Sequence, residues 1–275
     1  MHRMFKLLLI GFISIGLMYI GAMIFIYLLQ RKLQYAPTHR DAKGVGHAEF
    51  KPLLSDSGQF MGYWRPIGET GGEKAKAKRT IIFFHGNGGE ALDREWVSEI
   101  VPEEDFLVIL AEYPGYGPRG GAITEGSIFQ SSEYLIDQVQ KRWPAPITLL
   151  GESLGSGVAC YIAAKKRIDR LAMISPFSSA SDVAKMIYPY FPIKLLMRDK
   201  FDSVRYGHDI KVPVHIIHGT LDDVVPIQLG RDLFVAITSS EKTITEIPGY
   251  GHSNIVSAVT DSPFAETFRS FIRGE

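Results

Sequence analysis

The chain has 275 residues, of which 45% are hydrophobic and 22% are charged, a composition typical of a globular domain rather than a disordered chain. Its 30 basic and 30 acidic residues balance, so it lacks the charge excess of nucleic-acid-binding domains and we expect no nucleic-acid partner. The single cysteine, Cys160, excludes an internal disulfide and a cysteine-based zinc site.

The N-terminal segment from Leu7 to Leu29 contains no charged side chain and is almost wholly apolar. As a helix it extends roughly 35 Å, enough to cross the hydrocarbon core of a bilayer. A cleaved signal peptide is the alternative, but its apolar region is normally only about 7–15 residues long and ends at a small-x-small cleavage site, which this segment does not show. We therefore expect residues 1–33 to form a single-pass membrane anchor, with its helix at about 7–29.

Basic residues flank this segment on both sides and bear on its orientation. Arg3, Lys6 and the α-amine favour a cytoplasmic N-terminal tail, which would place the rest of the chain outside the cytoplasm. Basic residues on the other side compete: Arg31, Lys32, Arg40 and Lys43. On balance we predict a catalytic domain on the non-cytoplasmic side.

After an expected linker at 34–49, short apolar runs alternate with helical segments. The expected strands lie at 50–54, 59–64, 80–84, 106–111, 146–150, 171–174, 212–217 and 243–247. The expected helices lie at 91–101, 127–143, 156–164, 229–236 and 264–272. This alternation predicts one doubly wound α/β domain over 50–275, with a mainly parallel sheet and an active site outside the carboxyl ends of its strands.

The helix expected at 127–143 is amphipathic. Its apolar positions predict a buried face formed by Ile128, Tyr134, Leu135 and Val139.

The pentapeptide 151–155, Gly-Glu-Ser-Leu-Gly, places Ser153 between an expected strand and a helix of small residues. This is the nucleophile-elbow pattern, in which a tight turn holds the serine in strained backbone geometry. A side chain at Gly151 or Gly155 would collide with the neighbouring strand or helix. The pattern therefore predicts Ser153 as a catalytic nucleophile.

A serine nucleophile needs a base, and the base needs an acid that orients it. Among the eight histidines, His252 is the candidate base because it lies in the loop between the last expected strand and the last helix. His85 and His218 directly follow strands and precede glycine, where histidines more often brace loops. Asp222 and Asp223 follow the preceding strand; we choose Asp222 as the acid, while the other could cap the helix that begins near Pro226.

The glycine-rich loop 85–89, His-Gly-Asn-Gly-Gly, follows the strand at 80–84. Acyl transfer requires two N–H donors aimed at the tetrahedral oxygen. We expect these donors from the backbone of Leu154 and of Asn87. A phosphate-binding role is the alternative for this loop, but the Walker lysine and the G-x-G-x-x-G spacing are missing.

The stretch at about 176–210 is expected to form a small lid. Within it, the apolar segment 186–193 has three possible roles: packing beneath a loop, covering an acyl pocket, or dipping towards the bilayer near the anchor. No H-E-x-x-H helix or carboxylate cluster suggests a metal, and we expect no cofactor.

Together these motifs resemble the α/β-hydrolase family over essentially everything from Phe50 onwards. The resemblance rests on segments 83–89, 113–117, 151–155, 212–222 and 251–254. Within the family, the chain looks like membrane-anchored, small-lid serine hydrolases related to serine aminopeptidases and mammalian protein depalmitoylases. The family pattern H-G-x-x-D-x-x-V-P implies Asp222 as the acid. One departure from the family is Pro114 in segment 113–117, where relatives often carry arginine or another polar residue after the aromatic.

The sequence thus predicts a membrane-anchored serine hydrolase that cleaves carboxylic esters or thioesters through a Ser153–His252–Asp222 triad. Its partners would be a small-molecule or acyl substrate and, through the N-terminal helix, a membrane. An amidase or aminopeptidase with the same triad is the nearest alternative. A membrane-tethered binding protein without catalytic activity is the other. Oligomeric state, acyl-chain length and physiological substrate do not follow from the sequence.

Overall fold

The computed structural model describes residues 2–39, 49–67, 77–101 and 106–274, so most of the expected linker, with Arg40 and Lys43, lies outside the described residues. The elements occur in the order α1 (His2–Gln34), β1 (Ala36–Pro37), β2 (Lys51–Leu54), β3 (Phe60–Ile67), β4 (Arg79–Phe84), β5 (Gly88–Gly89), η1 (Ala91–Ser98), β6 (Phe106–Ala111), α2 (Glu125–Arg142), β7 (Ile147–Glu152), α3 (Leu154–Lys165), β8 (Arg170–Ile174), α4 (Ala180–Ile187), α5 (Ile193–Leu196), α6 (Ser203–Gly207), β9 (Val214–Gly219), α7 (Ile227–Ala236), β10 (Lys242–Ile247), α8 (Ile255–Thr260) and α9 (Ala265–Arg273).

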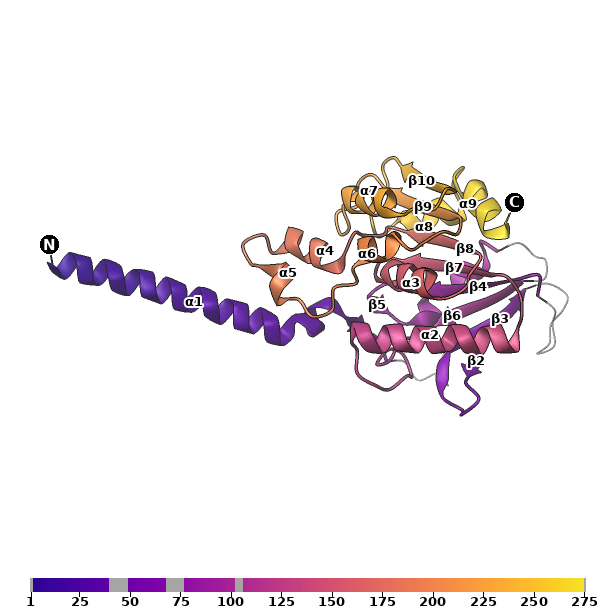
Figure 1. The fold of residues 1–275 in the computed structure, drawn as a ribbon, viewed down its shortest axis with the longest axis horizontal. Coiled ribbons are helices and arrows are strands. Elements are labelled where there is room, and N and C mark those ends of the chain that lie inside the picture. The colour runs from indigo at the N-terminus through magenta and orange to yellow at the C-terminus, as the bar shows by residue number, and fades with distance from the viewer. Residues whose placement is uncertain (1, 40–48, 68–76, 102–105, 275) are drawn as a thin grey trace.

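An eight-stranded sheet in the order β10-β9-β8-β7-β4-β6-β3-β2 forms the centre of the domain (Figure 1). The strands from β10 to β6 pair in parallel, whereas β3 pairs antiparallel with both β6 and β2. This is the mainly parallel sheet of the α/β-hydrolase fold that the sequence predicts. Because the strands are parallel, the loops after β4, β7, β9 and β10 all leave from the same edge.

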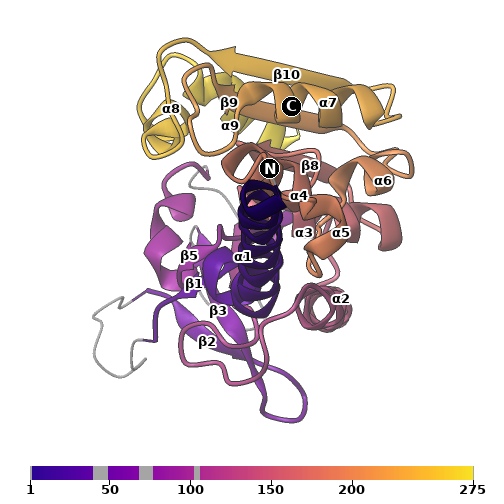
Figure 2. The ribbon, with the colours of Figure 1, turned by 90° about the vertical axis from the view of Figure 1, so that its left-hand side faces the viewer.

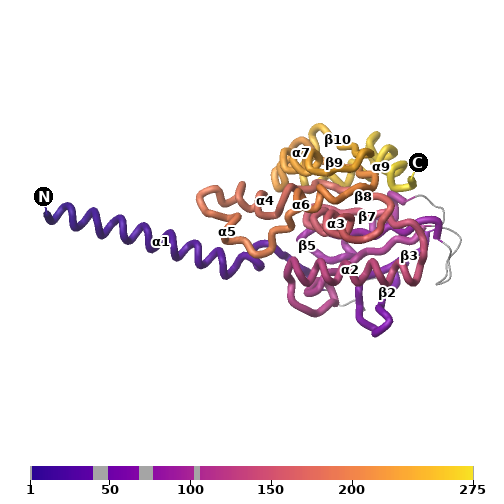
Figure 3. The backbone as a smooth tube through the Cα atoms, in the orientation of Figure 1, coloured from indigo at the N-terminus to yellow at the C-terminus, as the bar shows by residue number. Residues whose placement is uncertain are grey.

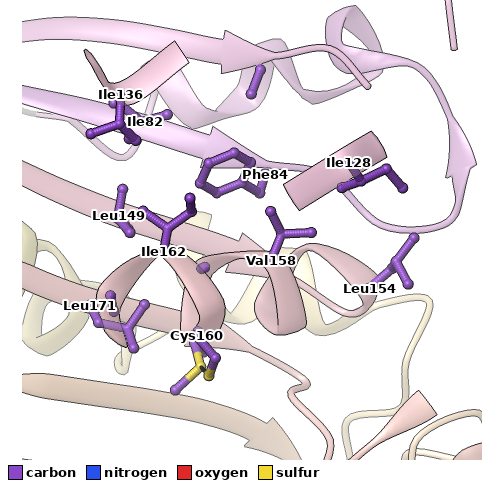
Figure 4. Packing of buried hydrophobic residues seen from close by; sticks show 14 of the residues in the cluster. Ile82, Phe84, Ile128, Ile136, Leu149, Leu154, Val158, Cys160, Ile162 and Leu171 are labelled. Carbon is purple, nitrogen blue, oxygen red and sulfur yellow. Dashed lines mark hydrogen bonds between the residues drawn. The ribbon is translucent and has the colours of Figure 1, made fainter. Parts of the chain in front are cut away.

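Helices cover both faces of this sheet, and the alternation of side chains along each strand divides the core in two. Ile82 and Phe84 of β4 pack with Val158 of α3 and Ile128 of α2 on one face (Figure 4). The alternate residues Ile81 and Phe83 pack on the other face with η1, α8 and α9. Every strand residue of β4 from Thr80 on is therefore buried.

Three details differ from the sequence expectations. Tyr134 is 37% exposed and does not belong to the buried face of α2, which Phe129 and Ile136 complete instead. The expected helix at 91–101 is a 3₁₀ helix with a kink at Arg94, where the side chain turns towards the sheet edge to bind Glu152. An additional short helix, α8, separates the His252 loop from the last helix; Asn254 precedes it without a side-chain cap, a weak local signal.

Helix α1 projects from the domain as a long apolar rod and is long and apolar enough to be a candidate transmembrane span (Figures 1 and 3). The chain that follows the C-terminal end of α1 is bonded to the domain. Strand β1 pairs in parallel with β5, and the N–H of Ala36 donates to the carbonyl of Asn87. Viewed along α1, helices α4 and α5 lie beside it (Figure 2). The segment after α1 is thus part of the domain's structure from its first residues.

The start of α3 packs directly against the end of β4. A Cβ atom added to Gly155 would lie 1.9 Å from the carbonyl oxygen of Phe84, and one added to Gly151 would lie 2.5 Å from the carbonyl oxygen of Gly155. Both contacts are with backbone, which cannot move aside without displacing a central strand. The elbow glycines are therefore required by close packing, as the sequence pattern indicates.

Replacing Gly155 by alanine is expected to lower the free energy of unfolding by about 3 kcal/mol or more, because the added methyl overlaps the β4 backbone. The matched control is Gly126→Ala in α2, where the nearest neighbouring atom lies 4.0 Å from the new Cβ and helix propensity favours alanine by about 0.5 kcal/mol. Urea unfolding of the full chain in detergent micelles measures both. Equal stability of the two variants would contradict the packing argument.

Candidate active site

Ser153 occupies the turn between β7 and α3. Its backbone has φ 51° and ψ −116°, a strained conformation for a residue with a side chain. Two hydrogen bonds hold this strained conformation: Ser153 donates its N–H to the carbonyl of Ile174 at 3.0 Å, and its carbonyl accepts the Ser156 hydroxyl at 2.6 Å. This geometry places the serine at the sheet edge, before the first turn of a helix.

Asp222 and His252 meet above the neighbouring strands β9 and β10. Nδ1 of His252 lies 2.8 Å from Oδ2 and 3.1 Å from Oδ1 of Asp222. Oδ1 also accepts the N–H groups of Val224 and Val225, at 3.1 and 2.7 Å. Asp223 is exposed, so of the two adjacent aspartates the structure brings Asp222 to the histidine.

The surroundings of Asp222 favour its charged form. Burial by itself raises the pKa of this carboxyl, but hydrogen bonds from His218, His252 and the Val225 N–H outweigh burial and hold the pKa below its ordinary value. His218 is fully buried and its Nε2 lies 2.8 Å from the Val225 carbonyl and 3.4 Å from Asp222. It braces the acid loop, as the sequence suggests for histidines that directly follow strands.

Ser153 and the Asp222–His252 pair share one edge of the sheet but are not yet joined. Among the hydrogen bonds of the described residues, none connects the Ser153 hydroxyl to the His252 ring. Val224 and Val225, which bind the acid, line the same cavity as Ser153. Catalytic hydrogen bonds are often long in unliganded enzymes and shorten when substrate binds.

Asn87 and Leu154 line this cavity beside Ser153, where the sequence predicts the two N–H donors. Leu154 is the first residue of α3, and N–H groups in a first helical turn have no partner within the helix. The Gly86–Asn87 peptide is held from its other side, since the Gly86 carbonyl lies 2.8 Å from His85 Nδ1. In a trans peptide the Asn87 N–H therefore points away from His85.

A buried network that the sequence analysis did not identify fixes this glycine-rich loop. His85 Nε2 lies 3.0 Å from a carboxylate oxygen of Glu112, and neither side chain is exposed. The Tyr113 hydroxyl donates to the His85 carbonyl, and the Tyr116 hydroxyl to the Asn87 carbonyl, each at 2.8 Å. The signal available in the sequence was Glu112, a charged residue directly after the fully buried strand beside β4.

The cavity over Ser153 has a volume of about 220 Å³ and is lined mainly by apolar side chains. Its walls come from three parts of the chain that are distant in sequence: the catalytic loops, the lid helices α4 and α5, and the last turns of α1. The contribution of α1 was not predicted, because an apolar helix has the same sequence pattern whether it faces lipid or a pocket.

Within the described part of the chain, no group of three or more His, Cys, Asp or Glu side chains is arranged to hold a metal ion. The groups gathered at the sheet edge are instead a hydroxyl, an imidazole with its carboxylate, and backbone N–H donors. These suit proton transfer and stabilisation of an oxyanion.

Because Asp222 has a lower pKa in the folded than in the unfolded chain, its stabilising contribution is present above the unfolded pKa of about 4 and is lost as the pH falls below it. We expect the difference in unfolding free energy between wild type and Asp222→Asn to shrink by about 1 kcal/mol from pH 5 to pH 3. His215, whose pKa burial lowers to about 4, titrates in both proteins and cancels from the difference.

Urea unfolding at the two pH values measures this change. Asp223→Asn is the matched control, because it alters the exposed neighbouring carboxylate and keeps the hydrogen bonds of Asp222. If the difference in unfolding free energy between wild type and Asp222→Asn stays constant with pH, the Asp222 carboxylate is not held in the charged form.

Comparison with known proteins supports the fold. Residues 79–204 match the family model of the alpha/beta hydrolase fold. An uncharacterized protein of Mycobacterium tuberculosis is 29% identical over 242 residues, which cover 85% of this chain and 84% of that protein. A lysophosphatidylserine lipase of Danio rerio is 26% identical over 227 residues, covering 70% of this chain and 59% of the lipase.

Among solved structures, an esterase of Pyrococcus furiosus superposes with a TM-score of 0.66 at 14% identity, covering 87% of this chain and 97% of the esterase. At this identity the likeness concerns the fold. The family model, the relatives and the shared architecture agree on one assignment. The chain has the α/β-hydrolase fold.

Proposed function

We propose that this chain is a membrane-anchored serine hydrolase that cleaves carboxylic esters or thioesters through an acyl-enzyme. The observation that carries the proposal is the pairing of His252 with Asp222 at the sheet edge where the strained turn presents Ser153. A buried carboxylate bonded to an imidazole beside a strained serine is the arrangement that serine nucleophiles require.

Acylation begins when the Ser153 hydroxyl attacks the acyl carbon and Nε2 of His252 accepts its proton. Asp222 holds the Nδ1–H of the ring and stabilises the imidazolium that forms. The tetrahedral intermediate then expels the alcohol or thiol, which leaves with the proton from His252. In the second half, water attacks the Ser153 ester, His252 again moves the proton, and the carboxylic acid is released.

The negative charge on the tetrahedral oxygen is stabilised by the N–H groups of Leu154 and Asn87. The hydrogen bonds from His85 to the Gly86 carbonyl and from Tyr116 to the Asn87 carbonyl keep the second donor in a fixed direction. Fixed donors stabilise a developing charge without reorganisation during the reaction, and loss of one such donor lowers kcat by about 100- to 1,000-fold.

Three observations support an acyl substrate. The cavity beside Ser153 is lined mainly by apolar side chains, which suits a hydrocarbon chain better than a peptide. The relative from Danio rerio is named as a lipase, whose substrates are esters. Helix α1 is long and apolar enough to hold the enzyme at a membrane. The orientation with the domain outside the cytoplasm stays a prediction from the flanking charges.

An alkyl fluorophosphonate probe is expected to label the wild-type chain and to leave Ser153→Ala unlabelled, as measured by mass spectrometry of the intact protein. Ser156→Ala is the control, because it removes the neighbouring hydroxyl and keeps the nucleophile. Labelling of Ser153→Ala would refute the assignment of the nucleophile. A folded wild type that neither reacts nor hydrolyses any ester or thioester would favour a binding protein.

A further inference from the structure

One face of α1 forms part of the wall of the Ser153 cavity. The lining residues of this helix are Ile26, Gln30, Leu33 and Gln34, which recur at the spacing of a single helical face. On the opposite side, Phe25 and Leu28 are 61% and 70% exposed. The helix therefore has two distinct faces near the domain, one towards the cavity and one outward.

Polar contacts hold this end of α1 in a defined position. The side-chain amide of Gln30 is 8% exposed; it donates to the Leu196 carbonyl and accepts the N–H of Arg198. Arg31 forms an ion pair with the buried Asp199 at 2.8 Å. The Asn87 side chain in turn donates to the Gln34 carbonyl at 3.1 Å. These bonds connect α1 to the lid and to the loop beside Ser153.

The lid extends along α1 well beyond these contacts. The Tyr19 hydroxyl donates to the Tyr190 carbonyl at 2.8 Å, and the Tyr19 ring stacks on Phe191 with centroids 5.4 Å apart. Tyr19 lies about 18 Å along the helix from Arg31, at 1.5 Å per residue. The tip of the lid therefore contacts α1 at Tyr19, in the middle of the apolar stretch of this helix.

The lid tip has the chemistry of a segment that lies in hydrocarbon. Residues 186–193 include no charged side chain, and Ile187 and Tyr190 are 61% and 86% exposed. The backbone of this tip is largely satisfied within itself: the N–H groups at positions 188, 191 and 193 donate to nearby carbonyls, and prolines occupy 189 and 192. Few backbone N–H groups of this tip would therefore lose a hydrogen bond to water if it entered lipid.

We propose that the last turns of α1 and the lid form an acyl channel that opens directly into the bilayer, so that the substrate is a membrane-resident acyl lipid. The proposal rests on the proposed function, because it assigns the substrate of that same Ser153 site. A bilayer that holds α1 at residues 7–29 surrounds the lid tip as well, since Tyr19 and Tyr190 are in contact. An acyl chain then passes between Ile26, Leu33 and the lid to Ser153 without crossing water.

In this arrangement α1 is a component of the binding site rather than a tether alone. The ester bond of the lipid lies near the polar boundary that Arg31 and Asp199 mark, close to Ser153, while the acyl chain points back along the apolar helix. The bond that breaks and the proton transfers are those of the hydrolysis described above.

The first test fills the channel from α1. Ile26→Trp adds a larger side chain to the cavity wall and so narrows the cavity. Phe25→Trp, the matched control, places a tryptophan on the outward face of the helix. The full-length variants are reconstituted in phosphatidylcholine vesicles and reacted with an ethyl and a dodecyl fluorophosphonate. We expect Ile26→Trp to lower the ratio of dodecyl to ethyl labelling rates at Ser153 at least tenfold, and Phe25→Trp to change it less than twofold.

An unchanged ratio in Ile26→Trp would overturn the role of α1 in acyl binding. Labelling of wild-type Ser153 by the ethyl probe shows in the same experiment that the hydrolase site itself is active. If neither probe labels wild-type Ser153, the proposed function fails and the acyl channel fails with it, so the two failures are distinguishable.

The second test measures where the lid lies. Cys160, the single cysteine, is fully buried, so a cysteine introduced on the surface takes up a thiol-reactive fluorophore alone. Tyr190→Cys labels the lid tip, and Val235→Cys labels α7 at a position that is 78% exposed in the wild type. Quenching by lipids with a nitroxide on the acyl chain is expected at position 190 and not at position 235. Absence of quenching at 190 would place the lid outside the bilayer and refute the channel.

Discussion

The close approach of α3 to the end of β4 is the contact on which the site depends. Glycine at 155 lets the helix backbone lie against the Phe84 carbonyl, and this proximity forces the chain at Ser153 into φ 51°. The strained turn in turn directs the serine into the cavity and aligns the first N–H groups of α3 beside it. Neither Ser153 nor the N–H groups in the first turn of α3 keep their place if the helix moves away from the strand.

The other polar groups of the site lie near that turn because the strands of the sheet are parallel. Loops after β4, β7, β9 and β10 leave the same edge, so the glycine-rich loop, the serine, the acid and the base come together although they are scattered along the chain. Contacts of buried histidines then fix two of these loops. His85 contacts Glu112 beneath the glycine-rich loop, and His218 contacts the Val225 carbonyl beneath the loop of Asp222. His85 and His218 thus hold the loops beside Ser153 and Asp222 in place.

Helix α1 and the helices α4 and α5 adjoin this site in one structure. Strand β1 pairs with β5 next to Asn87, Gln30 is buried against the lid, and the lid tip meets α1 at Tyr19. A tether needs none of these contacts, because a flexible linker would hold the domain at the surface equally well. Their presence is explained if the helix, the lid and the catalytic loops form the walls of one acyl-binding channel.

Local pattern was enough to predict much of this protein. Alternation of apolar runs with helices predicts the fold, because burial on both faces makes parallel strands continuously apolar. The elbow glycines mark Ser153, since only glycine permits that packing. The tertiary structure decided the rest: that Glu112 braces the glycine-rich loop, and that Ile26 faces the cavity. Each of these depends on which face of a loop or helix meets a neighbour distant in sequence, and composition or spacing does not encode that direction.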